Sequence, residues 1–215
     1  MTPIATAMTV FAGGMFFLAF LMSSRMRLGS LVTAFRVQSA LLALLAIAAA
    51  FVTGEFQLFI VAGLIVLIKV WFIPSFLLRA ARVSGASERL QSYARPATLS
   101  FVAACLAIVA LIGARGLLPV GADYFVLAAS FGIVLVGLLM LVSRKDMFGE
   151  GIGFFVMENG IFTFGLALTH GMPFLFEIGS FFDLLAFFIL ITVFTHRAQD
   201  ENASVATDDL RTLTD

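Results

Sequence analysis

The chain has 215 residues, of which 61% are hydrophobic and only 12% are charged, and its formal net charge is zero. A soluble domain typically carries about 25% charged residues, so this composition excludes a surface covered by water and indicates one covered by lipid. The neutral charge balance also argues against a nucleic-acid partner.

Apolar segments follow one another along nearly the whole chain. A helix that spans a membrane needs about 20 mainly apolar residues. In chain order, the segments that meet this requirement are 4–22, 31–53, 56–78, 97–114, 124–142, 148–169 and 174–195. We therefore predict an all-α fold, a polytopic transmembrane bundle of about seven helices. Residues 1–95 hold the first three helices and an inner loop, 96–197 hold the other four, and 198–215 form a polar cytoplasmic tail.

The basic residues predict the orientation, because cytoplasmic loops are enriched in Lys and Arg. If the N-terminus faces outward, Arg115 is the only basic residue in an outer loop. The inner loops and tail then hold Arg25, Arg27, Arg79, Arg82, Arg89, Arg95, Arg144, Lys145, Arg197 and Arg211. We expect a plasma or inner membrane protein with its N-terminus outside and its C-terminus in the cytoplasm.

Several classes of chemistry have no sequence signal. The single cysteine, Cys105, lies in an apolar run and is expected to be a small core residue. There is no phosphate-binding glycine loop, no cysteine cluster, no histidine pair for haem and no nucleophile beside a base. We expect no cofactor, no metal site and no catalytic centre in this chain, so energy for any transport has to come from a partner.

Ionisable residues inside the spans are the main functional signal, since each costs at least about 2.5 to 3.5 kcal/mol to insert and defaults to a functional hypothesis. Glu158 in FFVMENGIF, Asp183 in FFDLLAFFIL and Lys69 in LIKVWFIP lie near mid-depth, and Glu177 lies nearer the outer face. We predict that these four residues form a proton relay. The alternatives are fixed ion pairs and, for Glu177, an ordinary interfacial acid. Pro74, just after Lys69, is expected to kink its helix.

Other polar residues are predicted to support this relay. Asn159 can hydrogen bond beside Glu158, while Arg36 and Gln38 lie in the second span. Arg36 stays charged, so it either biases a neighbour or snorkels to lipid phosphates. Glu150 either hands protons inward or forms an interfacial ion pair. The glycines expected to let another helix or another subunit approach the sixth span are Gly151, Gly153 and Gly160.

Residues 123–197 resemble the three-helix K-type subunit of respiratory complex I and the C-type subunit of multi-subunit Na⁺/H⁺ antiporters. The shared layout is the basic turn SRKD, an acid and an asparagine near the centre of the next helix, and a mid-depth acid in the third. The first glutamate of that family usually stands four residues before the asparagine, where this chain has Phe155. Its role is therefore carried over to Glu158 by motif, with a shift of about one helical turn.

Over nearly its full length, including IKVWFIP, MENG and FEIGSFFDLL, the chain resembles hydrogenase-4 component E. That family is the enlarged K-like membrane subunit of group 4 NiFe hydrogenase and formate hydrogenlyase complexes. The resemblance implies antiporter-like and quinone-site-type membrane partners and a peripheral hydrogenase-like arm. It implies a subunit of an oxidoreductase complex, not itself catalytic, that takes part in proton or sodium translocation.

Other functions stay open at this point. One is a K/C-like subunit of an antiporter that has no redox arm. Another is a scaffold whose buried charges pair and never titrate. A stand-alone retinal photoreceptor is disfavoured, because the lysine deep in a span lies in the third helix rather than the last. A stand-alone small-molecule carrier would be indicated by stable purification of the chain as an active monomer.

Overall fold

The computed structural model consists mainly of long apolar helices. It describes residues 3–83, 87–117 and 123–169. The helices are α1 (Pro3–Ser24), α2 (Leu28–Thr53), α3 (Gln57–Ile65), η1 (Val66–Phe72), α4 (Ile73–Val83), α5 (Pro96–Leu117), α6 (Tyr124–Ser143) and α7 (Met147–Thr169). Helices α3, η1 and α4 are continuous and form one rod, which counts as a single span. The described residues therefore contain six helices that are long and apolar enough to cross a membrane. The predicted all-α polytopic bundle is confirmed, and the chain is a multi-pass membrane protein. The predicted span 174–195 and the tail lie outside the described residues.

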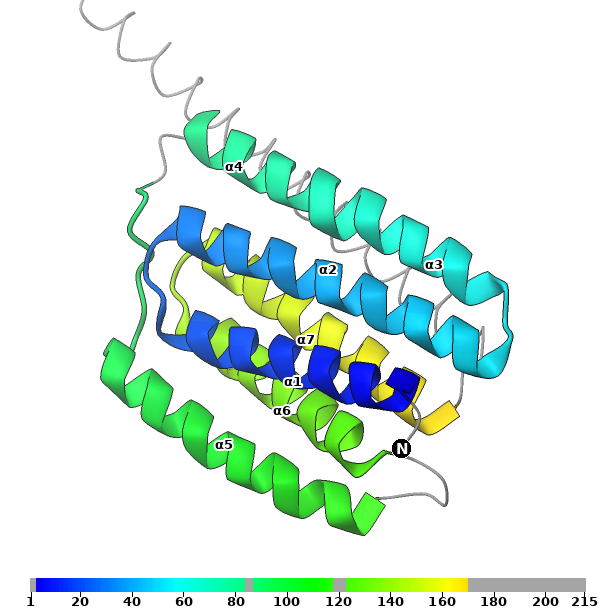
Figure 1. The fold of residues 1–215 in the computed structure, drawn as a ribbon. Coiled ribbons are helices and arrows are strands. Elements are labelled where there is room, and N and C mark those ends of the chain that lie inside the picture. Colours follow the sequence, from blue (N-terminus) through cyan, green and yellow to red (C-terminus); the bar gives the residue numbers. More distant parts are fainter. Residues whose placement is uncertain (1–2, 84–86, 118–122, 170–215) are drawn as a thin grey trace, which may run out of the picture.

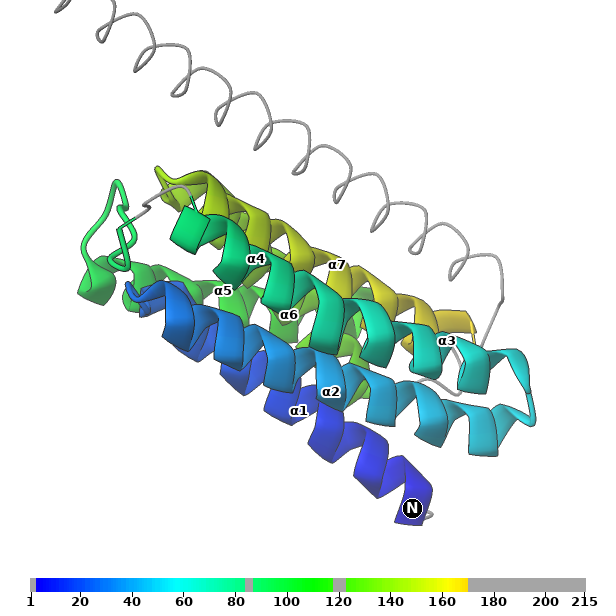
Figure 2. The same ribbon diagram turned by 90° about the horizontal axis from the view of Figure 1, so that it is seen from above.

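Four helices surround the centre of the bundle. Helix α1 packs against α2 and α6, and α7 packs against the same two helices, so the four close a ring. The rod α3–η1–α4 covers α2 at one edge, and α5 covers α6 and α1 at the opposite edge (Figure 1). In the view from above, the rod is drawn between α7 on one side and α2 and α1 on the other (Figure 2).

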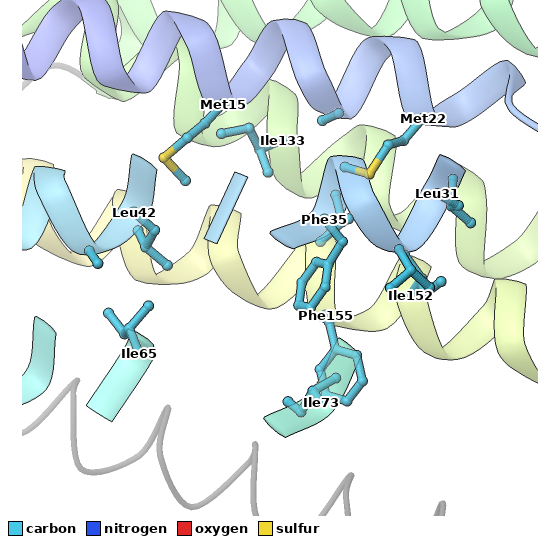
Figure 3. Close-up of a cluster of buried hydrophobic side chains, with 14 of the residues drawn as sticks. Met15, Met22, Leu31, Phe35, Leu42, Ile65, Ile73, Ile133, Ile152 and Phe155 are labelled. Carbon is cyan, nitrogen blue, oxygen red and sulfur yellow. The ribbon is translucent and has the colours of Figure 1, made fainter. Parts of the chain in front are cut away.

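The core is built by apolar side chains from every helix of the ring. Met15 of α1, Phe35 of α2, Ile133 of α6 and Phe155 of α7 are buried in one cluster (Figure 3). The rings of Phe35 and Phe155 lie 5.7 Å apart between centroids, so α2 and α7 touch directly. Ile73 of the rod belongs to the same cluster. This packing fixes which face of each helix turns inward.

Large apolar side chains also cover the outside, as lipid contact requires. Phe17, Phe51, Trp71 and Phe101 are all exposed. Cys105 on α5 is exposed as well, so its expected place in the core was wrong. The reason is the position of α5 at the edge of the bundle, where only one face of the helix meets other helices.

One end of the bundle carries most of the basic residues of the described turns, and we call it the basic end. The turns α1–α2, α4–α5 and α6–α7 meet there, and the described part of the α4–α5 connection, residues 87–95, runs between the other two. Backbone hydrogen bonds join the three turns: Leu28 N to Glu88 O (3.0 Å), Leu90 N to Met26 O (2.8 Å), Tyr93 N to Ser143 O (2.9 Å) and Lys145 N to Gln91 O (3.2 Å).

The opposite end has local caps instead. Gly54 ends α2 in the left-handed conformation, with φ 75°, and its N–H bonds to Ala50 O. Asp123 begins α6, and its carboxylate accepts hydrogen bonds from the N–H groups of Phe125 and Val126. The same carboxylate accepts a 3.0 Å hydrogen bond from the Thr9 hydroxyl, which ties α6 to α1.

Candidate functional site

A buried ion pair lies near the middle of the bundle. Lys69, on η1, and Glu158, on α7, place the lysine Nζ 3.3 Å from the carboxylate Oε1, and the two side chains are only 3% and 8% exposed. Lys69 Nζ also donates a 3.1 Å hydrogen bond to Asn159 Oδ1. Two of the predicted relay residues are therefore in direct contact, and a predicted supporting residue holds one of them.

The helix around Lys69 has an unusual geometry. Residues Val66–Phe72 form a π-helix, and the N–H of Ile73 bonds to Ile68 O, five residues earlier. Pro74 follows at once and has no N–H to donate, so the widened turns lie where regular α-helical bonding would already be interrupted. Short π segments within α-helices are frequent at functional sites. Here the π segment carries the buried lysine.

A chain of amides continues from Lys69 to the backbone of α1. Asn159 Nδ2 donates to Gln38 Oε1 and to Ser39 Oγ on α2, each at 3.3 Å. Gln38 Nε2 donates in turn to Met15 O at 3.1 Å. All these side chains are buried. The hydrogen bonds thus run in one direction, from the Lys69 ammonium through the amides of Asn159 and Gln38 to the backbone of α1. We call Gln38, Ser39, Lys69, Glu158 and Asn159 the central polar cluster.

Close packing of α6 and α7 fixes the position of the two α7 residues. A Cβ added to Gly160 would lie 2.7 Å from Val134 N, and one added to Gly137 would overlap the backbone of Met157. Only glycine allows this approach between the two backbones. One face of α7 therefore rests on α6, and Glu158 and Asn159 are turned toward α2 and η1. For Gly153 and Gly160, two of the three glycines predicted to allow a close approach, the neighbour is α6.

The remaining predicted residues lie elsewhere. Arg36 is half-buried on α2, and its Nε has no hydrogen-bond partner among the described residues. Glu150 is exposed in the first turn of α7, and no ion pair joins it to Arg144 or Lys145 within the described part of the chain. Asp183 and Glu177 lie outside the described residues. The relay and supporting roles of these four residues, like those of the residues in the central polar cluster, stay predictions.

A second buried cation was missed by the sequence analysis. Arg144 is 1% exposed, although it lies in the turn between α6 and α7. Its Nη2 donates to the backbone oxygens of Met22, Ser23 and Arg25 at 3.1, 3.1 and 2.8 Å, and its Nη1 lies 3.0 Å from the sulfur of Met26. The guanidinium therefore closes the C-terminal end of α1, where unpaired carbonyls and the helix dipole favour a cation. We call this arrangement the arginine clamp.

Burial lowers the pKa of the Arg144 guanidinium, and the nearby Asp146 carboxylate partly opposes that change. Because the pKa of Arg144 is lower in the folded protein than in the unfolded chain, the protonated guanidinium lowers the free energy of unfolding. That loss is recovered only as the pH rises through the folded-state pKa. Arginine stays protonated at ordinary pH. The clamp is therefore a fixed charge under those conditions.

Two kinds of chemistry are available at these sites. In the central polar cluster, a proton on Lys69 Nζ and a carboxylate on Glu158 are within reach of each other, so the pair can exist as two ions or as a neutral amine and acid. The clamp has no such option, because carbonyl oxygens do not take up a proton. Within residues 3–83, 87–117 and 123–169, no group of three or more His, Cys, Asp or Glu side chains could hold a metal ion.

The chain is similar to a known protein along nearly its whole length. The chain is 26% identical over 207 residues to an uncharacterized protein of Mycobacterium tuberculosis, and the match covers 95% of this chain and 94% of the relative. No known protein family and no solved structure matches the chain. The two proteins are thus similar along nearly their whole lengths.

Proposed function

We propose that this chain is a membrane subunit of a complex-I-like assembly of the group 4 NiFe hydrogenase type, and that its central polar cluster contributes to proton or sodium translocation. The observation that carries the proposal is the buried Lys69–Glu158 pair, which lies near the middle of η1 and α7. The resemblance to hydrogenase-4 component E supports the kind of assembly. Partners would supply the redox chemistry and the other ion channels.

The mechanism we propose uses the two forms of the pair. A proton that moves from Lys69 Nζ to the Glu158 carboxylate leaves a neutral amine and a neutral acid, and conserves the total charge. A charge change in a neighbouring subunit would favour one form over the other, because electrostatic effects are strong in a medium of low dielectric constant. If the pair takes up a proton from one side of the membrane and releases it to the other side, a proton crosses the membrane. Asp183 and Glu177 are the proposed further stations.

The basic end supplies the proposed orientation. The described turns at that end carry Arg25, Arg27, Arg89, Arg95 and Lys145, whereas Arg115 lies toward the opposite end. By the positive-inside rule, this end faces the cytoplasm and the N-terminus faces outward. A peripheral redox arm would then lie on the side of the basic end.

A scaffold role is the competing proposal, and the same geometry favours it. The Lys69 ammonium already contacts a carboxylate and an amide oxygen, so the pair could hold α7 and η1 together without ever titrating. A buried ion pair can often be replaced by apolar residues of similar volume at little cost in stability. A variant with an apolar pair in place of Lys69 and Glu158 should therefore keep a scaffold role but lose a relay role.

The test is the double variant Lys69→Met with Glu158→Leu, compared with Glu158→Gln, in the assembled complex. Each is assayed for assembly, for redox turnover and for ion translocation per electron in sealed vesicles. If the cluster conducts, the double variant should assemble and turn over, but translocation should be lost, as in Glu158→Gln. Full translocation by the assembled double variant would reject the relay and favour the scaffold.

The alternative assembly is a K/C-like antiporter complex with no redox arm. Purification of the tagged chain in mild detergent should recover hydrogenase-like large and small subunits together with antiporter-like ones. Recovery of antiporter subunits alone would favour the alternative. This result does not depend on whether Lys69 and Glu158 titrate.

A further inference from the structure

A pocket of about 430 Å³ opens between α1 and α2 at the basic end. Its apolar wall includes Leu18 and Leu21 of α1 and Ala34 and Val37 of α2, and its polar rim includes Arg25 and Ser30. Binding pockets for small molecules commonly measure about 300 to 1,000 Å³. The central polar cluster does not line this pocket.

The rim has the chemistry to bind an anion. Arg25 Nη1 donates a 3.2 Å hydrogen bond to Ser30 Oγ, which orients the guanidinium beside the pocket. Arg25 is exposed, and a guanidinium has five N–H donors, so several remain for a ligand. Planar guanidinium groups bind phosphate with paired hydrogen bonds. The rim lies where α1 has ended and α2 begins, at the expected level of lipid headgroups.

The wall extends from that rim into the apolar part of the bundle. Leu18 lies six residues before Ser24, the last residue of α1, which at a rise of about 1.5 Å per residue is about 9 Å deeper than the end of the helix. Val37 lies at a similar distance from the rim on α2. A ligand that fills the pocket therefore needs a charged group at one end and an apolar chain at the other. A free anion would leave the wall unfilled, and a soluble peptide would not reach it.

We propose that this pocket binds an anionic phospholipid of the leaflet at the basic end, with its phosphate on Arg25 and Ser30 and an acyl chain along the wall. Basic pockets between transmembrane helices bind anionic headgroups in this way. The proposal goes beyond the function proposed above and does not depend on it, since it requires only that the chain lies in a membrane.

The test uses the full chain in nanodiscs that contain phosphatidylglycerol and phosphatidylcholine in equal amounts. Lipid that stays bound after release into detergent is identified by native mass spectrometry. Phosphatidylglycerol should be retained preferentially by the wild type. Arg25→Gln should lower its retention about fivefold, the effect of removing one basic residue near a charged headgroup. The control Arg82→Gln removes an exposed arginine of α4 that does not line this pocket, and should retain the lipid.

A second variant separates the wall from the rim. Ala34→Leu fills the apolar groove but keeps Arg25, so it should also lower retention, while elution as a single peak shows that the protein is folded. Adding inorganic phosphate should not displace the lipid. Equal retention of both lipids by the wild type, or unchanged retention by both variants, would overturn the proposal. Displacement by inorganic phosphate would show an anion site without lipid specificity, and would overturn it too.

Discussion

Lys69 and Arg144 are two almost fully buried cations in one protein, with 2% and 1% of their surface exposed. Lys69 contacts a carboxylate and a side-chain amide, whereas Arg144 contacts three backbone carbonyls and a thioether. The lysine can lose its proton and its partner can accept one, but neither is true of the clamp at ordinary pH. Burial alone therefore does not distinguish a charge that can exchange a proton from one that cannot. The chemistry of its partner does.

Depth distinguishes the two sites further. The central polar cluster lies where α2, α7 and η1 are at mid-length, far from either end of the bundle. The arginine clamp lies in a turn, where it joins the end of α1 to the end of α6. The first site is suited to respond to charge, and the second to hold two helices together. The predictions below test this division.

The largest effect is expected from removing one member of the buried pair. Glu158→Leu leaves the Lys69 ammonium in an apolar site without its carboxylate, and should lower the free energy of unfolding by about 3 to 5 kcal/mol. The measurement is the thermal unfolding of the purified chain in detergent. Adding Lys69→Met to this variant should restore most of the loss. If Glu158→Leu is as stable as the wild type, the ion pair does not stabilise the fold.

Loss of the arginine clamp should come next. Arg144→Lys keeps the charge but lacks the planar fork that reaches three carbonyls, so we expect a loss of about 2 to 3 kcal/mol of stability. The control is Lys145→Gln, which changes the exposed neighbour and should stay within about 0.5 kcal/mol. Ion translocation per assembled complex should be unchanged in both. If Arg144→Lys impaired translocation without lowering stability, the clamp would belong to the ion path.

A smaller effect should follow from separating α6 and α7. Gly137→Ala places a methyl group against the backbone of Met157, next to Glu158, and should cost about 1 to 3 kcal/mol. Gly63→Ala is the matched control, because nothing lies within 4 Å of its added Cβ, and helix propensity should make it neutral or slightly stabilising. Thermal unfolding measures both. Equal stability of the two variants would mean that α6 does not hold α7 in place.

The smallest effect is expected at the surface. Arg27 and Glu88 form an ion pair of 3.8 Å, but their side chains are 80% and 89% exposed. Because water and salt screen such a pair, Glu88→Gln should cause no measurable change in unfolding temperature. A clear loss would indicate that the turns of the basic end depend on this side-chain contact rather than on their backbone hydrogen bonds.

Much of the fold could be predicted from the sequence, because spans of about 20 apolar residues separated by charged turns leave few alternatives. The importance of Lys69 and Glu158 followed from the cost of burying charge. Their direct contact did not, since it depends on how α7 and η1 are placed around α2. That placement comes partly from glycine contacts between α6 and α7. The sequence indicated a close approach at Gly153 and Gly160, but not at Gly137, which lies against the backbone of Met157.

The missed residues have a common physical reason. Arg144 stands beside Lys145 in a basic turn, and the sequence gives no sign that one is buried and the other exposed. Ser39 lies in an apolar span and has an ordinary helix neighbourhood, yet it accepts a hydrogen bond from Asn159. Cys105 was expected in the core because its segment is apolar. In a membrane protein, apolar character does not distinguish the lipid face from the interior.

The connection that contains residues 87–95 also has an evolutionary consequence. It leads from α4 at one edge of the bundle to α5 at the other, and most of the hydrogen bonds that join it to the neighbouring turns are made between main-chain atoms. Two others use side chains, the Ser92 hydroxyl to Ser143 O and the Gln91 N–H to the Asp146 carboxylate. Main-chain pairing is indifferent to most side chains but sensitive to spacing. Homologous chains should therefore differ freely in most residues of this stretch, Ser92 excepted, but hardly in its length, the reverse of what is usual for a surface loop.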